Sequence, residues 1–393
     1  NDTVIELVKI IEVNYLDSIN TSIGFVLSRE GDNIAYYHMD DMLQRGLNRT
    51  ETVLHWDNSI MINQKMGGEK MFMINGLPND EIDILYGGVK INNIESPINV
   101  FNPISDLGLS EFIITNGGYS KYSASPGSIN YIPRLSYDNK LMLNQLKNDK
   151  NTTILEGFGS LGIKYALTNG GTYQKKYSFS NSDSTDLKVN TNINNYFANL
   201  GFTNRKNVEL FLSAFQNQKL QNRIYNDDLA KDNISSVINN NFIAKIDQWS
   251  PFTGRVSVYG LIQNREGLNY DQIDFNDESM TLGFSVEKDR ENSMITFSTA
   301  STIINSDWKI NNDRAVIGRQ NSVINCSFEL FLDQKSNYAH FKDLKMVFSK
   351  ERTTDVKDPL SEVDILPNYW DEHSFQVSAT IVDQKEHKNN SFY

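Results

Sequence analysis

The residues able to do chemistry are few in this chain, and their spacing matches no catalytic motif. The five histidines form neither an H-E-x-x-H motif nor a paired metal-binding spacing; they are His38, His55, His340, His373 and His387. No G-x-S-x-G nucleophile turn and no phosphate-binding loop occurs. Asp40 and Asp41 form an adjacent acid pair, but carboxylates at a helix start are typical caps. The sequence therefore predicts no enzyme, no cofactor and no metal site.

A single cysteine, Cys326, limits redox and metal chemistry further. One cysteine forms no intrachain disulfide and no cysteine-rich metal site. It alternates with Phe328 and Leu330, which predicts a place on the apolar face of a strand rather than a role as a nucleophile.

Charge and hydropathy narrow the class of protein. The 393 residues carry a formal net charge of −12, which argues against a nucleic-acid partner because such proteins need a basic face. Mean hydropathy is −0.46, and no apolar run approaches the roughly 18 residues that a membrane-spanning helix needs. These values leave a membrane β-barrel open, because its strands alternate apolar and polar residues.

The elements that must position any site fall into two parts. Before Arg134, apolar runs separated by Gly, Asn, Pro and Asp predict a compact α+β unit of short strands with one helix over 40–54. The apolar runs are Met71–Ile74, Ile82–Leu85, Val89–Ile91, Phe112–Ile114 and Ile129–Ile132. After Arg134, segments of roughly 8 to 12 residues alternate with period two and predict successive β-hairpins.

Five segments show the alternation most clearly, each with apolar residues at every second position. They are Leu161–Leu167, Asn195–Phe202, Met280–Glu287, Asn325–Leu332 and Ser374–Ile381. A soluble β-sandwich turns such an apolar face inward, whereas a membrane barrel turns it outward to lipid. The pattern alone leaves both open, and the length of the region favours a barrel, whose closure removes exposed strand edges.

The stretch Gly67–Ser136 contains an ordered series of strands and turns that is more specific. Its elements are Met71–Asn75 with Gly76, Ile84–Ile91 with Gly87 and Gly88, then Asn102, Pro103, Ile104, Phe112–Thr115, and finally Asn116, Gly117, Gly118, Tyr119, Ser120, Tyr122, Ser123, Pro126, Gly127, Ser128 and Ile129–Tyr131. In order and spacing this series resembles the plug domain of TonB-dependent outer-membrane receptors.

The resemblance implies an antiparallel membrane β-barrel with an N-terminal α+β plug inside its lumen. It divides the chain into an N-terminal arm over 1–20, a plug over 21–136 and a barrel over 137–393. Plug turns are expected at Gly76, Gly87, Gly88, Gly117, Gly118, Pro126 and Gly127, where glycine permits positive φ. In ordinary β-rich domains the same residues also form simple turns.

Two departures from the family pattern concern how the plug is held. Where the family usually has arginine before glycine, this chain has Asn75 and Asn116. A buried paired charge holds a plug differently from an amide, which only forms hydrogen bonds. The departure puts the attachment and release of the plug in doubt.

The N-terminal residues Asp2, Thr3, Val4, Ile5 and Glu6 resemble a TonB box, the segment offered as an added strand to a periplasmic energy-coupling protein. A β-branched stretch suits strand addition because its backbone supplies the bonds. A first strand of the plug is the alternative interpretation.

Ligand contacts in the family come from plug loops together with the barrel. By resemblance, those loops are 63–70, 77–82 and 91–96, and they are rich in carboxylates and amides. Their candidate residues are Gln64, Lys65, Glu69, Asn79, Asp80, Glu81, Asn92, Asn93 and Glu95. They suggest a polar cup for a cationic, hydroxylated or metal-chelate ligand, or else solvated loop tips.

The resemblance predicts a bacterial outer-membrane receptor that binds a scarce nutrient, such as a metal chelate, cofactor or oligosaccharide, and imports it with TonB-coupled energy. Expected partners are the energy-coupling protein, membrane lipid and the ligand. Two alternatives remain: a plugged barrel that serves as a structural or docking subunit beside other outer-membrane proteins, and a soluble β-rich adhesin or glycan-binding module. The start at Asn1 predicts a mature form. Family barrels have about 22 strands, so residues 137–393 predict an incomplete barrel.

Overall fold

The computed structural model describes most of the chain beyond residue 33. The described ranges are 34–40, 50, 60–64, 70–74, 77–78, 82–92, 105–116, 127–135, 137–148, 152–181, 187–204, 207–225, 234–268, 273–290, 293–310, 315–335, 340–357 and 369–382. The predicted arm over 1–20 lies outside them.

Two small sheets make up what we call the N-terminal unit, the described residues from Ile34 to Leu135. One has the order β1-β7-β8-β5-β6, in which β5 and β8 run parallel and the other neighbours antiparallel. Its strands are β1 (Ile34–His38), β5 (Asp83–Tyr86), β6 (Val89–Lys90), β7 (Leu109–Asn116) and β8 (Gly127–Pro133), with a 3₁₀ turn η1 (Asp106–Gly108) before β7. The other sheet contains β2 (Ile60–Gln64), β3 (Lys70–Ile74) and β4 (Leu77–Pro78). The apolar runs predicted as short strands are therefore strands.

Helical structure is sparse in the described part of this unit. Met39, Asp40 and Thr50 have helical backbone, and the rest of the helix predicted over 40–54 lies outside the described residues. Among the described residues, no helix is long and apolar enough to cross a membrane.

Gly87 and Gly88 form the turn between β5 and β6, as predicted. Their φ angles are 58° and 78°, in the left-handed region that side chains with a Cβ rarely adopt. A Cβ on Gly87 would also lie 3.1 Å from the ring of Phe211. Glycine is thus required twice over, by the turn and by the contact with a strand far along the chain.

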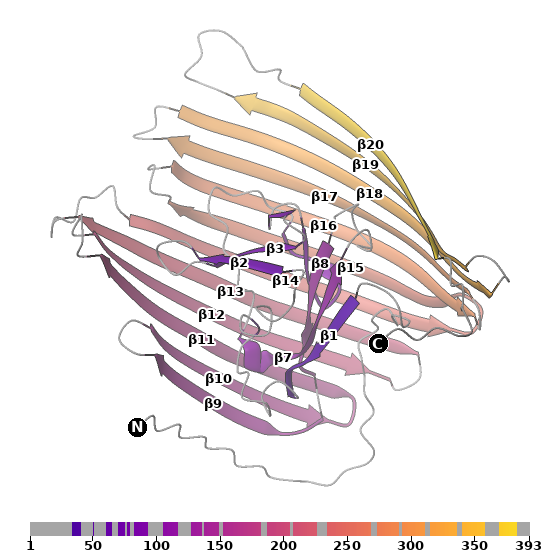
Figure 1. Ribbon diagram of the computed structural model, residues 1–393, viewed down its shortest axis with the longest axis horizontal. Helices are drawn as coiled ribbons and strands as arrows, with labels where there is room; N and C mark the ends of the chain where they lie inside the picture. The colour runs from indigo at the N-terminus through magenta and orange to yellow at the C-terminus, as the bar shows by residue number, and fades with distance from the viewer. Residues whose placement is uncertain are drawn as a thin grey trace, which may run out of the picture.

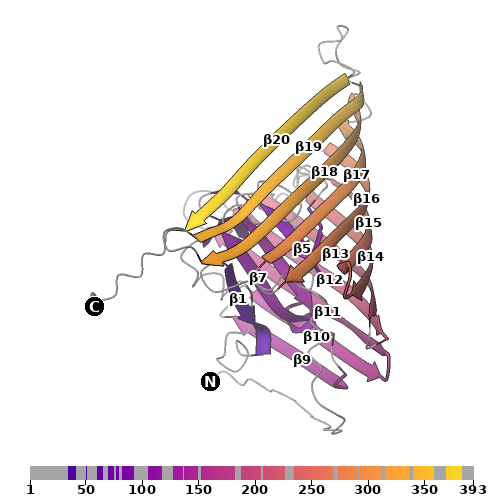
Figure 2. The same cartoon turned by 90° about the vertical axis from the view of Figure 1, so that its right-hand side faces the viewer.

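A single antiparallel sheet of twelve strands forms the rest of the described chain. Every strand pairs with its neighbours in sequence, from β9 at one edge to β20 at the other. The strands are β9 (Lys140–Asn148), β10 (Thr152–Ile163), β11 (Ala166–Asn181), β12 (Leu187–Thr203), β13 (Val208–Tyr225), β14 (Ile234–Ser250), β15 (Gly254–Leu268), β16 (Ile273–Arg290), β17 (Ser293–Ile310), β18 (Ala315–Lys335), β19 (His340–Lys357) and β20 (Tyr369–Val382). The sheet is curved, and the N-terminal unit lies against its concave face (Figures 1 and 2).

On the strands whose side chains the structure describes, β9 to β17, the alternation is confirmed and the apolar side is the exposed one. On β16, Met280 and Leu282 are 49% and 57% exposed, whereas Thr281 between them is 3% exposed. On β12, Asn195 and Asn199 are buried against the concave side. A soluble sandwich would bury the apolar face. The opposite arrangement here is typical of a membrane barrel.

One predicted strand is wrong. Leu161–Leu167 is not continuous, because Lys164 and Tyr165 form a two-residue turn between β10 and β11. Ile163 is 64% exposed on one strand and Leu167 is 3% exposed on the next. The turn lacks the Gly, Asn or Pro that usually marks a hairpin, and the apolar spacing continues across it.

Two other predicted segments lie within single strands. The strand that contains Cys326 is β18, where Cys326 lies opposite Thr299. Ser374–Ile381 lies in β20.

Candidate functional site

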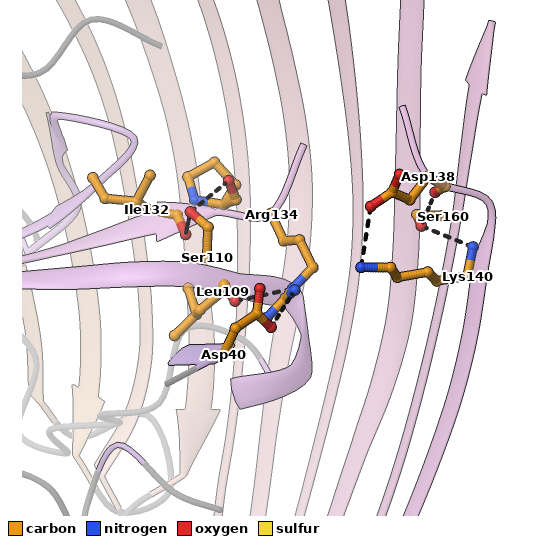
Figure 3. Close-up of polar contacts among 9 residues, drawn as sticks. Asp40, Leu109, Ser110, Ile132, Arg134, Asp138, Lys140 and Ser160 are labelled. Atoms are coloured by element: carbon orange, nitrogen blue, oxygen red, sulfur yellow. Dashed lines mark hydrogen bonds and ion pairs between the residues drawn. The ribbon is translucent and has the colours of Figure 1, made fainter. Parts of the chain in front are cut away.

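Arg134 is the centre of the junction between the N-terminal unit and the sheet (Figure 3). Its guanidinium is buried, pairs with Asp40 at 2.8 Å and donates from Nε to the carbonyl of Leu109 at 3.2 Å. Its backbone N–H donates to the carbonyl of Gly108 at 2.8 Å, and its own carbonyl accepts from Asn169 on β11. This one residue therefore joins the chain after β1, the end of η1 and the wall of the sheet.

Four further hydrogen bonds connect the N-terminal unit to the concave face, and we call them the seat. They are Ser105 Oγ to Glu156 Oε1 at 3.1 Å, Tyr86 Oη to Asn199 Oδ1 at 3.0 Å, Lys245 Nζ to the Gly87 carbonyl at 3.5 Å, and Gln263 Nε2 to the Ile91 carbonyl at 2.6 Å. The sheet residues come from β10, β12, β14 and β15. None of the four is an ion pair between the unit and the sheet.

Aromatic packing fills the space around the seat. Tyr86 contacts Phe215 and Phe211, with ring centroids 5.2 Å and 6.3 Å away. A Cβ on Gly108 would lie 2.3 Å from Cζ of Phe197, so η1 approaches β12 as closely as a backbone without a side chain allows. Burial raises the pKa of the Tyr86 hydroxyl well above its usual range, so it remains a hydrogen-bond donor.

Charged side chains on the sheet support the seat from within the wall. Asp247 accepts from Arg255 at 2.7 Å and pairs with Lys245 at 3.4 Å. Lys245 thus contacts both a carboxylate on its own strand and the backbone of the N-terminal unit. Pairing within the sheet compensates the cost of burying these charges.

A row of polar residues crosses the concave wall one inward-facing position beyond Gln263 of the seat, in the register of Glu156. Asn217, Asn239, Arg265 and Asp277 lie directly opposite one another on β13 to β16, and all are at most 5% exposed. Oδ1 of Asn239 has no hydrogen-bond partner among the described residues, and neither has Nδ2 of the neighbouring Asn241. We call Asn217, Asn239, Arg265 and Asp277 the polar row. Buried polar atoms need partners, so this wall suits a polar ligand or further polar protein groups.

Most predicted site residues lie outside the described residues. These are the arm residues Asp2 to Glu6, the loop residues Lys65, Glu69, Asn79, Asp80, Glu81, Asn93 and Glu95, the turn residues Gly76, Gly117, Gly118 and Pro126, and also Asn75. Gln64 ends β2, Asn116 ends β7 and Gly127 begins β8.

Asn92 has a structural role in the part of the chain that is described. Its Oδ1 accepts from the Ile84 N–H at 3.0 Å, and its Nδ2 donates to the Ile82 carbonyl at 2.7 Å. The Asn92 amide therefore closes the β5–β6 hairpin, and both its oxygen and its nitrogen form hydrogen bonds. These hydrogen bonds are local, and a contact of Asn92 with a ligand stays a prediction.

Sequence reasoning missed the sheet side of the site entirely. Arg134, Asn199, Gln263 and the polar row received no functional prediction. The signal was the unusual number of Asn and Gln residues at alternate positions of β12 to β15, such as Asn195, Asn199 and Asn217. The role of these Asn and Gln residues depends on whether their face of the sheet is the concave one, and the strand pattern alone does not show which face is concave. Among the described residues, no group of three or more His, Cys, Asp or Glu side chains is arranged to hold a metal ion.

No family model matches the sequence, and no curated protein matches it either. Solved structures do match in fold. The FrpB iron transporter from Neisseria meningitidis superposes with a TM-score of 0.70 at 11% identity, over 92% of this chain and 63% of that one. The copper transporter OprC gives 0.68 at 8% identity, over 90% and 60%. P. aeruginosa FpvA in complex with an iron-loaded pyoverdine gives 0.63 at 11%, over 91% and 55%.

This chain spans about 55% to 63% of the length of those structures. At such low identity the likeness concerns the fold, and it agrees with the outward apolar face of the sheet. The chain has the fold of the TonB-dependent outer-membrane receptors.

Proposed function

We propose that this protein is an outer-membrane receptor that binds a scarce nutrient and imports it, with the N-terminal unit as its plug. The observation that carries the proposal is the seat: the unit lies on the concave, polar side of a sheet whose convex side is apolar. A receptor of this type needs a wall that faces lipid outside and a movable obstruction inside.

The lengths of the connections suggest an orientation in the membrane. At one end of the sheet they are 164–165, 204–207, 251–253, 291–292 and 336–339, at most four residues each. At the other end they are 149–151, 182–186, 226–233, 269–272, 311–314 and 358–368, of which three are longer, with five, eight and eleven residues. Outer-membrane barrels have short periplasmic turns and longer extracellular loops. The short end is thus the periplasmic end, and β9 begins there.

The same orientation supports a ligand site on the extracellular side. The polar row lies farther from the short end than the Gln263–Ile91 contact does, and level with Glu156 of the seat. Amide, guanidinium and carboxylate groups suit a metal chelate or another polar ligand better than an apolar one. The solved relatives include transporters of iron and of copper and a receptor with bound iron-loaded pyoverdine. We propose a metal or metal-chelate nutrient, bound between this wall and plug loops that carry Gln64, Lys65, Glu69, Asn79, Asp80, Glu81, Asn93 and Glu95.

Energy would enter through the N-terminal arm, where Asp2 to Glu6 would add a strand to a TonB-type protein.

The hydrogen bonds of the seat suit displacement of the plug. Single hydrogen bonds each contribute about 0.5–1.5 kcal/mol net, whereas breaking a buried ion pair costs about 3–5 kcal/mol. Further strands would join the unpaired edges of β9 and β20 to complete the barrel.

Deletion of residues 1–7 tests the energy-coupled import. Cells that express the full chain or the deletion are supplied in turn with ferric pyoverdine, haem and copper(II) as the only source of the metal. We expect growth on one source with the full chain, no growth with the deletion, and unchanged binding of that source by the two purified proteins. Equal growth would refute the assignment of the arm. Binding of none of the three, with stable co-purifying membrane proteins, would favour the docking-subunit alternative.

A further inference from the structure

Beyond the apolar band, the described side chains on the convex face carry opposite charges on β9 to β12 and on β15 to β17. On β9 to β12, the charged outward residues in this zone are Lys147, Lys176 and Lys188, all exposed. Among the described side chains of β15 to β17 they are Glu266, Asp274, Glu278 and Asp307, also exposed. In a chain with a net charge of −12, the described outward charges of β9 to β12 in this zone are lysines.

Two of these lysines flank one position in the sheet. Lys147 and Lys176 both lie directly opposite Thr153 of β10, on the two neighbouring strands. Two strand spacings separate them by about 10 Å, so their long side chains can meet at one group between them. Both lysines lie near the end of the sheet that has the longer connections. On β9, Lys147 is the second outward-facing residue after Leu143.

Below Thr153, the same strand has a shallow slot where two outward residues, Gly157 and Gly159, have no side chain. A Cβ on Gly157 would meet Thr172 Oγ1 of β11 at 3.4 Å and Leu143 Cδ2 of β9 at 3.6 Å, and one on Gly159 would meet Leu141 Cδ1 at 4.0 Å. Leu141 and Leu143 are 67% and 59% exposed and form the wall of the slot on β9. The slot is continuous with the rest of the apolar band.

We propose that this sector of β9 to β11 binds an anionic phospholipid, with its headgroup between Lys147 and Lys176 and an acyl chain over Gly157 and Gly159. The inference rests on the membrane embedding in the proposed function. Charge complementarity selects an anionic headgroup, and continuity with the apolar band selects a lipid rather than a soluble phosphate. The acidic sector on β15 to β17 would repel the same headgroup.

The test is lipid retention by the full chain, purified from mixed micelles that contain equal amounts of phosphatidylglycerol and phosphatidylcholine and analysed by native mass spectrometry. We expect wild type to retain phosphatidylglycerol about tenfold over phosphatidylcholine. The Lys147→Gln, Lys176→Gln double variant should lose that preference. The control Asn276→Asp, Asn305→Asp makes the same change in net charge on the acidic sector and should keep it. Gly157→Leu, which fills the slot, should lower retention of both lipids with the lysines intact.

Wild type without a preference, or a control that loses it equally, would overturn the inference. Circular dichroism of each variant checks that the strands remain folded. Because retention is measured without transport, a failure here leaves the uptake experiment unaffected. Loss of uptake with normal lipid retention would count only against the import function.

Discussion

The hydroxyl of Tyr86 donates a 3.0 Å hydrogen bond to Oδ1 of Asn199, which joins the N-terminal unit to β12, the fourth strand of the curved sheet. Asn199 in turn donates from Nδ2 to Oδ1 of Asn169 at 2.8 Å, and Asn169 donates to the carbonyl of Arg134. A continuous chain of neutral hydrogen bonds therefore runs from the end of β5, through two strands, to the junction at Arg134. This bond of the seat and the junction belong to one polar network.

Replacing Tyr86 by Phe should weaken this network. The ring keeps its contacts with Phe215 and Phe211, but Asn199 Oδ1 loses its donor inside the protein. We expect a loss of about 1–3 kcal/mol in the free energy of unfolding, since a buried acceptor would be left unsatisfied. Urea denaturation in detergent measures it. In a double-mutant cycle with Asn199→Ala, the two losses should not add; simple additivity would contradict the coupling.

The same hydroxyl should make stability depend on alkaline pH. Burial raises the pKa of Tyr86 above its usual value of 10.0. The unfolded chain then releases this proton at lower pH than the folded protein does. The contribution of Tyr86 to the free energy of unfolding is therefore fully present below about pH 10. Above that pH it falls by about 1.4 kcal/mol per pH unit, until the folded protein also releases the proton.

Unfolding free energies measured from pH 8 to 11 should show this fall in wild type. The Phe variant lacks the group and should show a shallower slope over the same range. Identical slopes would mean that Tyr86 does not titrate differently in the two states.

Gly108→Ala should disturb the approach of η1 to β12. The new methyl would lie 2.3 Å from Cζ of Phe197, which is itself 5% exposed and stacked 6.4 Å from Phe158. Overpacking of this kind costs about 1–3 kcal/mol. The effect is measurable as faster proteolysis of the N-terminal unit in the purified protein. Adding Phe197→Leu should recover most of the loss, because it removes the atoms that clash; no recovery would mean that the strain arises elsewhere.

Leu282→Arg tests which face of the sheet meets lipid. Leu282 is 57% exposed in the middle of the outward apolar band, so a charge there should cost about 2–4 kcal/mol in a bilayer. Asn276→Arg, on the same face of β16 but beyond the band, is the matched control and should cost about 0–1 kcal/mol. Urea titration of folding into liposomes compares them. Equal costs would contradict the proposed position of the membrane.

Local features of the fold were predictable because they depend on neighbours in sequence. The period-two pattern of Met280 to Glu287 predicts a strand, and Gly87-Gly88 predicts a tight turn. The Lys164-Tyr165 turn was missed because its residues have no turn preference, and register alone reveals it. The N-terminal unit was predicted from an ordered series of short elements, each weak by itself.

Alternation in the amino-acid sequence is enough to predict a chain rich in strands with one apolar and one polar face, because alternation follows from backbone geometry. That the polar face is the concave one follows from the folded structure, in which the N-terminal unit packs on Asn199 and Phe197 rather than on Leu282. The folded structure also decided that Arg134 meets Asn169 and that Gln263 meets Ile91. These pairs are far apart in sequence, and their contact depends on the curvature and register of twelve strands together, which no local pattern encodes.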